Sequence, residues 1–250
     1  MPAQTIDDVI DQLDGIIHWA KKSNSRLGYF PALYRKVTIE VRQRIADGCF
    51  DDGLRMERLD VQFANRYLDA FEAYVAGDRL SASWQVALDA SHDWSAIVLQ
   101  HLLLGINAHI NLDLGIAAAQ TCPGDSIESL HDDFNRINQV LSSLVKNVEL
   151  ALSEVWPMLK LLDWIAGKNE QAIIHFSIDA ARKAAWNEAL ALAHSDCRTA
   201  EEQIRLIDKK VALLARSIQH PGPIVGTLTN TIRLGERKGI REIIEVLEAI

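Results

Sequence analysis

The stretch that decides the fold is Ser95–Gln120, SAIVLQHLLLGINAHINLDLGIAAAQ. It is the most apolar long segment of the chain, and this predicts a buried helix around which other helices pack. Five polar side chains interrupt the segment: His101, Asn107, His109, Asn111 and Asp113. A polar group inside a core costs free energy unless it finds a hydrogen-bond partner. We therefore expect these side chains to bind one another and neighbouring helices, or to bind a ligand.

Working outward from this stretch, apolar residues recur at helical spacing and no strand-like alternation is found. Clusters of Asp, Gly and Pro break the pattern at 51–53, 122–124 and 220–223. Asp93 is expected to cap the central helix, and a further long helix is expected to start at Asp125 or Ser126. The pattern predicts an all-α protein: one domain over 1–250, a multi-helix bundle of about nine to ten helices around central helices 94–121 and 168–195.

Composition excludes several classes of function. The net charge is −8 and the basic residues are dispersed, which argues against nucleic acid as a partner. No apolar run is long and uninterrupted enough to predict a membrane span, and the acidic first helix predicts no signal peptide. The three cysteines are widely spaced and are expected to be reduced thiols in a cytoplasmic protein. The oligomeric state is left open.

Two pairs of the form His-xxx-Asp are the strongest chemical signal. His109 with Asp113, and His175 with Asp179, each lie four residues apart and so on one face of a helix. Together the two pairs would suit a divalent metal such as zinc, iron or manganese. Pairs of this kind also arise by chance at this composition, and the alternative is that each Asp orients its His inside the bundle.

Other polar side chains on apolar helix faces are candidates for substrate binding. Arg182 is spaced to pair with Asp179 and to lay its guanidinium on Trp186, or else to hold a ligand carboxylate or phosphate. Arg66 with Tyr67 allows the same two interpretations. Gly105, between His101 and His109, indicates tight helix packing or the close approach of a ligand.

Four motifs resemble, in this order along the chain, a bacterial family of uncharacterised proteins, DUF5995. They are FANRYLDAFEAYVAGDRLSASW, HLLLGINAHINLDL, DDFNRINQVL and RKAAWNEALAL. The resemblance implies an all-helical domain of about this chain's length, without an assigned activity. The positions to which it points are Arg66, Tyr67, His101, Asn107, His109, Asn111, Asp113, Asp133, Asn138, Arg182 and Trp186.

These observations leave three hypotheses of function. The first is a metal-dependent hydrolase or oxidase that binds its metal through His109, Asp113, His175 and Asp179, with no catalytic residue assigned. The second is a module that binds or senses a small molecule without catalysis. The third is a wholly structural polar network. The expected substrate-binding residues are Arg66, Tyr67, His101, Asn107, Asn111, Arg182 and Trp186.

Overall fold

The structure is a computed structural model that describes residues 1–138 and 178–222 and, beyond these, 227, 229, 232, 233, 236 and 238–249. In these residues it has nine α-helices and no β-strand, which confirms the all-α class. The α-helices are α1 (Ile6–Ser23), α2 (Tyr29–Ala46), α3 (Gly53–Ala76), α4 (Ala82–Asp89), α5 (Val98–Ala108), α6 (Leu114–Thr121), α9 (Ile178–Ala193), α10 (Cys197–Gln219) and α12 (Ile240–Ala249). Four short elements connect them: η1 (Arg26–Gly28), η2 (Ala90–His92), η3 (His109–Asp113) and η4 (Gly124–Leu130).

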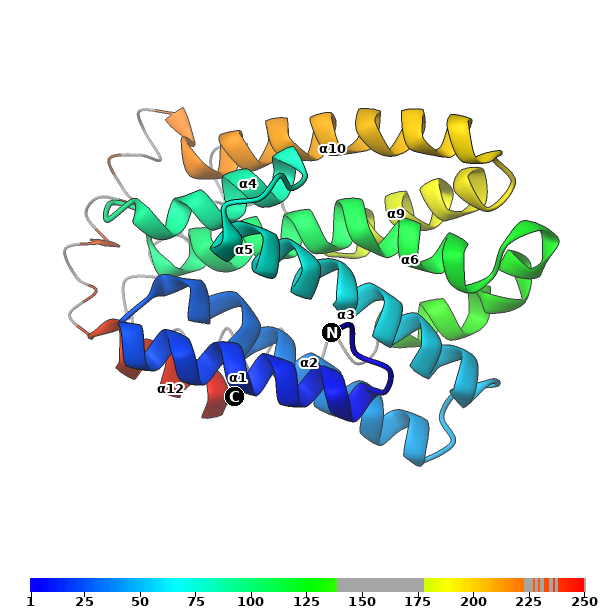
Figure 1. The fold of residues 1–250 in the computed structure, drawn as a ribbon, viewed down its shortest axis with the longest axis horizontal. Coiled ribbons are helices and arrows are strands. Elements are labelled where there is room, and N and C mark those ends of the chain that lie inside the picture. The colour runs from blue at the N-terminus through cyan, green and yellow to red at the C-terminus, as the bar shows by residue number, and fades with distance from the viewer. Residues whose placement is uncertain are drawn as a thin grey trace.

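The predicted central helix does lie at the centre of the bundle. Figure 1 shows α10 along one edge of the molecule, α1, α2 and α12 along the opposite edge, and α5 between them. The segment from α5 to α6 contributes side chains to each hydrophobic cluster in the described part of the chain. Each neighbouring helix therefore buries its apolar face against this segment or against a helix that contacts it.

The central helix begins at Val98, later than the sequence predicted. Asp93 does not cap it, because its carboxylate accepts the backbone N–H and the hydroxyl of Ser95. The first turn is satisfied by two other side chains. Gln100 Oε1 accepts the N–H of Ile97, and Glu236 Oε1 accepts the N–H of Val98. A long-range contact therefore helps to set the start of the helix.

A second difference lies within the central helix. Residues 109–113 form a π-helical turn, η3, in which the N–H of Leu114 donates to the carbonyl of His109, five residues earlier. Turns of this kind inside α-helices are rare and occur frequently at functional sites. The helical period of the sequence predicted one unbroken α-helix here.

Side chains next to the helix starts cap two of the other helices: Thr5 caps α1 with Asp8 in a reciprocal capping box, and Asp196 caps α10. A 3-10 turn, η4, followed by a helical stretch at 131–138 replaces the single helix expected from Asp125 or Ser126. Of the predicted helix 168–195 the structure describes α9, which packs along α6 and leaves one face exposed; residues 168–177 lie outside the described part.

One described segment, Val98–Thr121, is long and apolar enough by length and composition to cross a membrane. Inside this fold, 83% of its most apolar window is buried among the other helices. The expected absence of a membrane span stays a prediction.

Gly105 provides the close approach that its position suggested. A Cβ atom added at Gly105 would lie 2.4 Å from Cδ2 and 2.6 Å from Cγ of Phe30. Real Cβ atoms essentially never come so close, so the Phe30 ring occupies the space that a side chain at position 105 would fill. The absence of a Cβ is what lets α2 pack against α5.

Replacing Gly105 by Ala should therefore lower the free energy of unfolding by about 1–3 kcal/mol, the usual cost of overpacking a core. The matched control is Gly15→Ala in α1, where an added Cβ meets nothing within 4 Å. Since Gly weakens a helix interior, this control should gain about 0.5–1 kcal/mol. Urea denaturation measures both variants, and equal effects of the two would contradict the packing argument.

Candidate functional site

The Asp113 carboxylate is the centre of a buried polar network. Its Oδ1 accepts Nε–H of Arg66 at 2.7 Å, and its Oδ2 accepts the indole Nε1–H of Trp84 at 2.8 Å. His109 Nδ1 lies 3.3 Å from the same Oδ2. Three donors on α3, α4 and η3 thus meet one carboxylate that has no exposed surface. Both oxygens are occupied, so the negative charge is compensated within the protein.

His109 lies in an aromatic enclosure beside this carboxylate. The Phe63 ring stacks on the imidazole with centroids 3.5 Å apart, and Tyr34 meets it edge-on at 4.5 Å. Burial lowers the pKa of His109, although its contact with Asp113 acts in the opposite direction, so the ring is neutral near pH 7. Nδ1 donates to Asp113, which leaves Nε2 as an acceptor. Nε2 has no hydrogen-bond partner among the described residues.

A small cavity adjoins the network, with Trp84 in its wall. It is lined by residues of η1, α2, α3, α4, η2 and α5: Arg26, Leu27, Phe30, Tyr67, Trp84, Ala87, Leu88, Ser91, His101 and Gly105. Its volume of about 20 Å³ is room for about one water molecule. Arg26 lies at this wall and donates from Nη1 to the carbonyl of Ser91 at 3.1 Å, which links η1 to η2.

His101 and Tyr67 line this cavity from two helices that are distant in sequence. His101 is 6% exposed and Tyr67 is completely buried. Burial, and then the positive charge of Arg26, lower the pKa of His101 to about 4. Neither His101 Nε2 nor Tyr67 Oη has a hydrogen-bond partner in the described structure.

Unpartnered polar atoms gather on this side of the bundle. Eight buried side-chain atoms lack a hydrogen-bond partner among the described residues, and five of them belong to Tyr34, Asp60, Tyr67, His101 and His109. An unpaired buried group costs about 1–3 kcal/mol, so such groups are rare in folded proteins. Their gathering in one region marks it as the candidate functional site.

The other candidates on the central helix face a different neighbour. Asn107 donates from Nδ2 to the carbonyl of Val211 on α10, and its Oδ1 accepts Nδ2–H of Asn111. Asn107 therefore binds the central helix to α10, and Asn111 supports its amide. The structure does not bring them to the cavity.

Arg182 and Trp186 belong to a separate cluster. The Arg182 guanidinium donates to Asn138 Oδ1 and to the carbonyl of Phe134, and lies over the Phe134 ring at 4.4 Å. Trp186 packs against the same ring. The expected stacking of Arg182 on Trp186 is thus replaced by Phe134. Phe134 and Asn138 lie 48 and 44 positions from Arg182, so the sequence could not show these long-range contacts.

The second predicted His-xxx-Asp pair is described only at its Asp. Asp179 is exposed at the start of α9, and His175 lies outside the described residues. Among the side chains that the structure places, no group of three or more His, Cys, Asp or Glu lies together as for a metal ion. The metal set of His109, Asp113, His175 and Asp179 stays a prediction.

Asp133, to which the family resemblance also pointed, has a structural role. Its buried carboxylate accepts the N–H groups of Asp51 and Asp52 and the guanidinium groups of Arg55 and Arg136. Burial alone would raise the pKa of Asp133, but these donors outweigh it and lower the pKa. Asp133 thereby anchors the turn that precedes α3.

Sequence reasoning missed Trp84, Tyr34, Phe63 and Asp60. Trp84 closes the motif FANRYLDAFEAYVAGDRLSASW, but nothing local shows that its indole reaches Asp113. Asp60 lies seven residues before Tyr67 and so on the same side of α3, a spacing that could have drawn attention to it. Burial and the nearby Glu57 raise the pKa of Asp60 to about 7.

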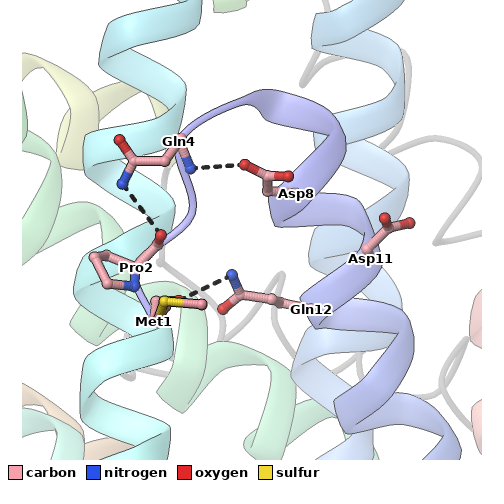
Figure 2. A pocket seen from close by; sticks show the side chains of 6 residues that line it. All are labelled: Met1, Pro2, Gln4, Asp8, Asp11 and Gln12. Atoms are coloured by element: carbon pink, nitrogen blue, oxygen red, sulfur yellow. Dashed lines mark hydrogen bonds between the residues drawn. The ribbon is translucent and has the colours of Figure 1, made fainter.

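A larger depression, of about 410 Å³, lies apart from this network at the start of the chain. Figure 2 shows its lining of Met1, Pro2, Gln4, Asp8, Asp11 and Gln12, whose polar groups bond to one another and to nearby backbone. It holds none of the unpartnered buried atoms. We therefore do not regard it as a functional site.

The fold and its interior define a class of protein: an all-helical bundle with a small aromatic cavity beside a buried Asp-His-Arg-Trp network. Residues 6–221 match the model of a family of unknown function, DUF5995. The chain belongs to this family, as its motifs suggested. Comparison with curated proteins and with solved structures finds no match.

The carboxyl group of Asp60 should make stability depend on pH. Its pKa is higher in the folded protein than in the unfolded chain, so folding takes up a proton between about pH 4 and 7. Its contribution to stability is therefore lost as pH rises through this range. Asp60→Asn should gain stability relative to the natural protein on going from pH 5 to pH 8, by at most about 1.4 kcal/mol per pH unit.

Urea denaturation at pH 5, 6, 7 and 8 measures this difference. Asp11→Asn, on the exposed face of α1, is the control and should show the same pH profile as the natural protein. A constant difference between Asp60→Asn and the natural protein over this range would refute the argument.

Proposed function

We propose that the protein binds a small molecule in the cavity between η1, α2, α3, α4 and α5. The observation that carries the proposal is the pair of unpartnered buried atoms, Tyr67 Oη and His101 Nε2, on residues lining one cavity. Apolar and aromatic walls with a few convergent polar groups are typical of small-molecule sites. The ligand would supply the hydrogen bonds that the protein leaves unmade.

The cavity wall at η1 supplies the route of entry. Arg26 and Leu27 are half-buried there, and η1 is a single short turn. Because the cavity has room for about one water molecule, a larger ligand would have to displace the Leu27 side chain, while the bond from Arg26 to the carbonyl of Ser91 would hold η1 to η2. Trp84, elsewhere in the lining, is held in place by the hydrogen bond from its indole to the buried Asp113.

Tyr67→Phe tests the proposal by separating stability from binding. Removing a hydroxyl that has no partner should raise the free energy of unfolding of the ligand-free protein by about 1 kcal/mol. For a chain of this length that is a rise in melting temperature of about 2–4 °C. Tyr74→Phe, whose hydroxyl donates to Asp89 at the surface, is the matched control and should give no gain.

The binding arm uses a library of neutral fragments and ligand-observed NMR. Fragments that bind the natural protein should lose binding in Tyr67→Phe and in Ala87→Leu, a variant that fills the cavity. Fragments that bind all three proteins equally, or a loss of stability in Tyr67→Phe, would count against this site.

A metal-dependent hydrolase or oxidase is a second candidate, and one observation favours it. His109 turns Nδ1 to the Asp113 carboxylate and leaves Nε2 unpartnered, which is the arrangement of many metal-binding histidines. Because Arg66 and Trp84 occupy the oxygens of Asp113, that carboxylate would orient His109 and not bind the metal itself. A metal there would activate bound water as a nucleophile.

Metal analysis of protein purified without a His-tag decides this candidate. The metal hypothesis predicts stoichiometric zinc, iron or manganese in the natural protein and none in His109→Ala. His194→Ala, at an exposed position, is the control and should keep the metal. Equal metal content in the natural protein and His109→Ala, or none in either after growth with added metal, would reject it.

A further inference from the structure

We infer that α12, together with Arg233 and Glu236, is a latch that controls access to the proposed cavity. This C-terminal latch opens locally and releases η1, the part of the cavity wall that contains Arg26 and Leu27. The inference rests on the proposed function and names the step that regulates the same site. The whole C-terminal latch lies beyond residue 221, where the match to the family model ends.

The helix α12 packs directly on η1 at Gly28. A Cβ atom added at Gly28 would lie 2.6 Å from Cβ of Ala20 on α1 and 2.6 Å from Cδ1 of Ile244 on α12. Ile244 has no exposed surface and shares a hydrophobic cluster with Tyr29, the residue after Gly28. The backbone of η1 is therefore held between α1 and α12, and Leu27, the residue before Gly28, is held with it.

The C-terminal latch also binds the start of α5, the helix from which His101 lines the cavity. Glu236 Oε1 accepts the N–H of Val98, and Arg233 Nε donates to the carbonyl of Trp94. Glu236 and Arg233 form an ion pair with each other, so the two contacts are linked. The C-terminal latch thus contacts two elements of the cavity wall, η1 and α5.

The attachment of α12 is small. Figure 1 shows α12 beside α1 and α2, against which it buries three aliphatic side chains, Ile243, Ile244 and Leu247. At the surface an ion pair that is about one-quarter exposed joins Lys21 to Glu248. A helix of ten residues is marginal by itself, and elements with few buried contacts open at a lower free energy than the whole fold. We therefore expect the C-terminal latch to open while the other helices stay packed.

Hydrogen exchange followed by mass spectrometry tests whether η1 opens together with α12. The amides of Gly28 and Tyr29 report on η1, because both are hydrogen-bonded within this turn. Ile244→Ala removes buried methyl groups from the latch and should raise exchange in η1 and α12 about tenfold or more, with α9 unchanged. Ile207→Ala is the matched control, because it makes the same change at a buried position of α10 in another cluster. It should leave exchange in η1 unchanged.

A charge reversal at the surface tests the same opening without leaving a hole in the core. Lys21→Glu places a like charge beside Glu248 and should raise exchange in η1 and α12 about threefold. Lys22→Glu makes the same change of charge at the adjacent, exposed position and should exchange like the natural protein. Exchange in η1 that stays at the natural rate in Ile244→Ala and Lys21→Glu would overturn the inference. An equal rise in every helix would also overturn it, because α12 would then open only with the whole fold.

A thiol in the cavity wall measures access without any ligand. Leu88→Cys, in a variant whose three natural cysteines are replaced by Ala, places this thiol at a lining position that is 6% exposed. Its reaction with methyl methanethiosulfonate should become faster when Lys21→Glu is added and should not change with Lys22→Glu. Equal rates in the two variants would overturn control of the cavity by the latch. Faster reaction with Lys21→Glu, together with a fragment library in which nothing binds, would support the latch and count against the proposed function alone.

Discussion

The compensation of one buried charge, the carboxylate of Asp113, is the constraint on which the interior depends. An isolated ionised carboxylate in a protein core is too costly to keep, but this one accepts hydrogen bonds from α3 and α4 and lies against His109. The charge-assisted bond from Arg66 is the strongest of these contacts, and it comes from a side chain that is still 30% exposed. Asp113 thus connects the core to the surface of α3. It also fixes the indole of Trp84 and the ring orientation of His109.

The central helix distributes its polar groups among different neighbours, and this lets it be both buried and polar. Gln100 donates to the carbonyls of Ile218 and Gln219 at the end of α10, and Asn107 donates to the carbonyl of Val211 further along the same helix. His109 and Asp113 point to α3 and α4 instead. These contacts specify which helix packs where, because a shifted helix would leave each group unpaired.

Several buried charged groups of the described residues are hydrogen-bonded, whereas several buried neutral groups are not. Asp133 and Arg182 are buried and charged, yet each makes several hydrogen bonds with described residues. Tyr67 and His101 are buried and uncharged, yet Tyr67 Oη and His101 Nε2 have no hydrogen-bond partner among the described residues. This contrast is why we propose a ligand beside Tyr67 and His101, since proteins give up local stability mainly at functional sites.

By itself the sequence determined the helical class, the central position of the segment 98–121 and the pairing of His109 with Asp113. These features depend on periodicity and on spacing along one helix, which are local properties. It also indicated that Gly105 allows close packing, although not that Phe30 fills the space. The π-turn at 109–113 has no counterpart in the apolar period.

Only the tertiary structure decided which polar residues share a site. It brought Trp84 and Arg66 to Asp113, set Tyr67 and His101 in the lining of one cavity, bonded Asn107 to α10, and placed Arg182 on Phe134 and Asn138. These contacts join residues 29 to 104 positions apart. The sequence period says which face of a helix is buried, but the partner of that face depends on how all the helices pack together.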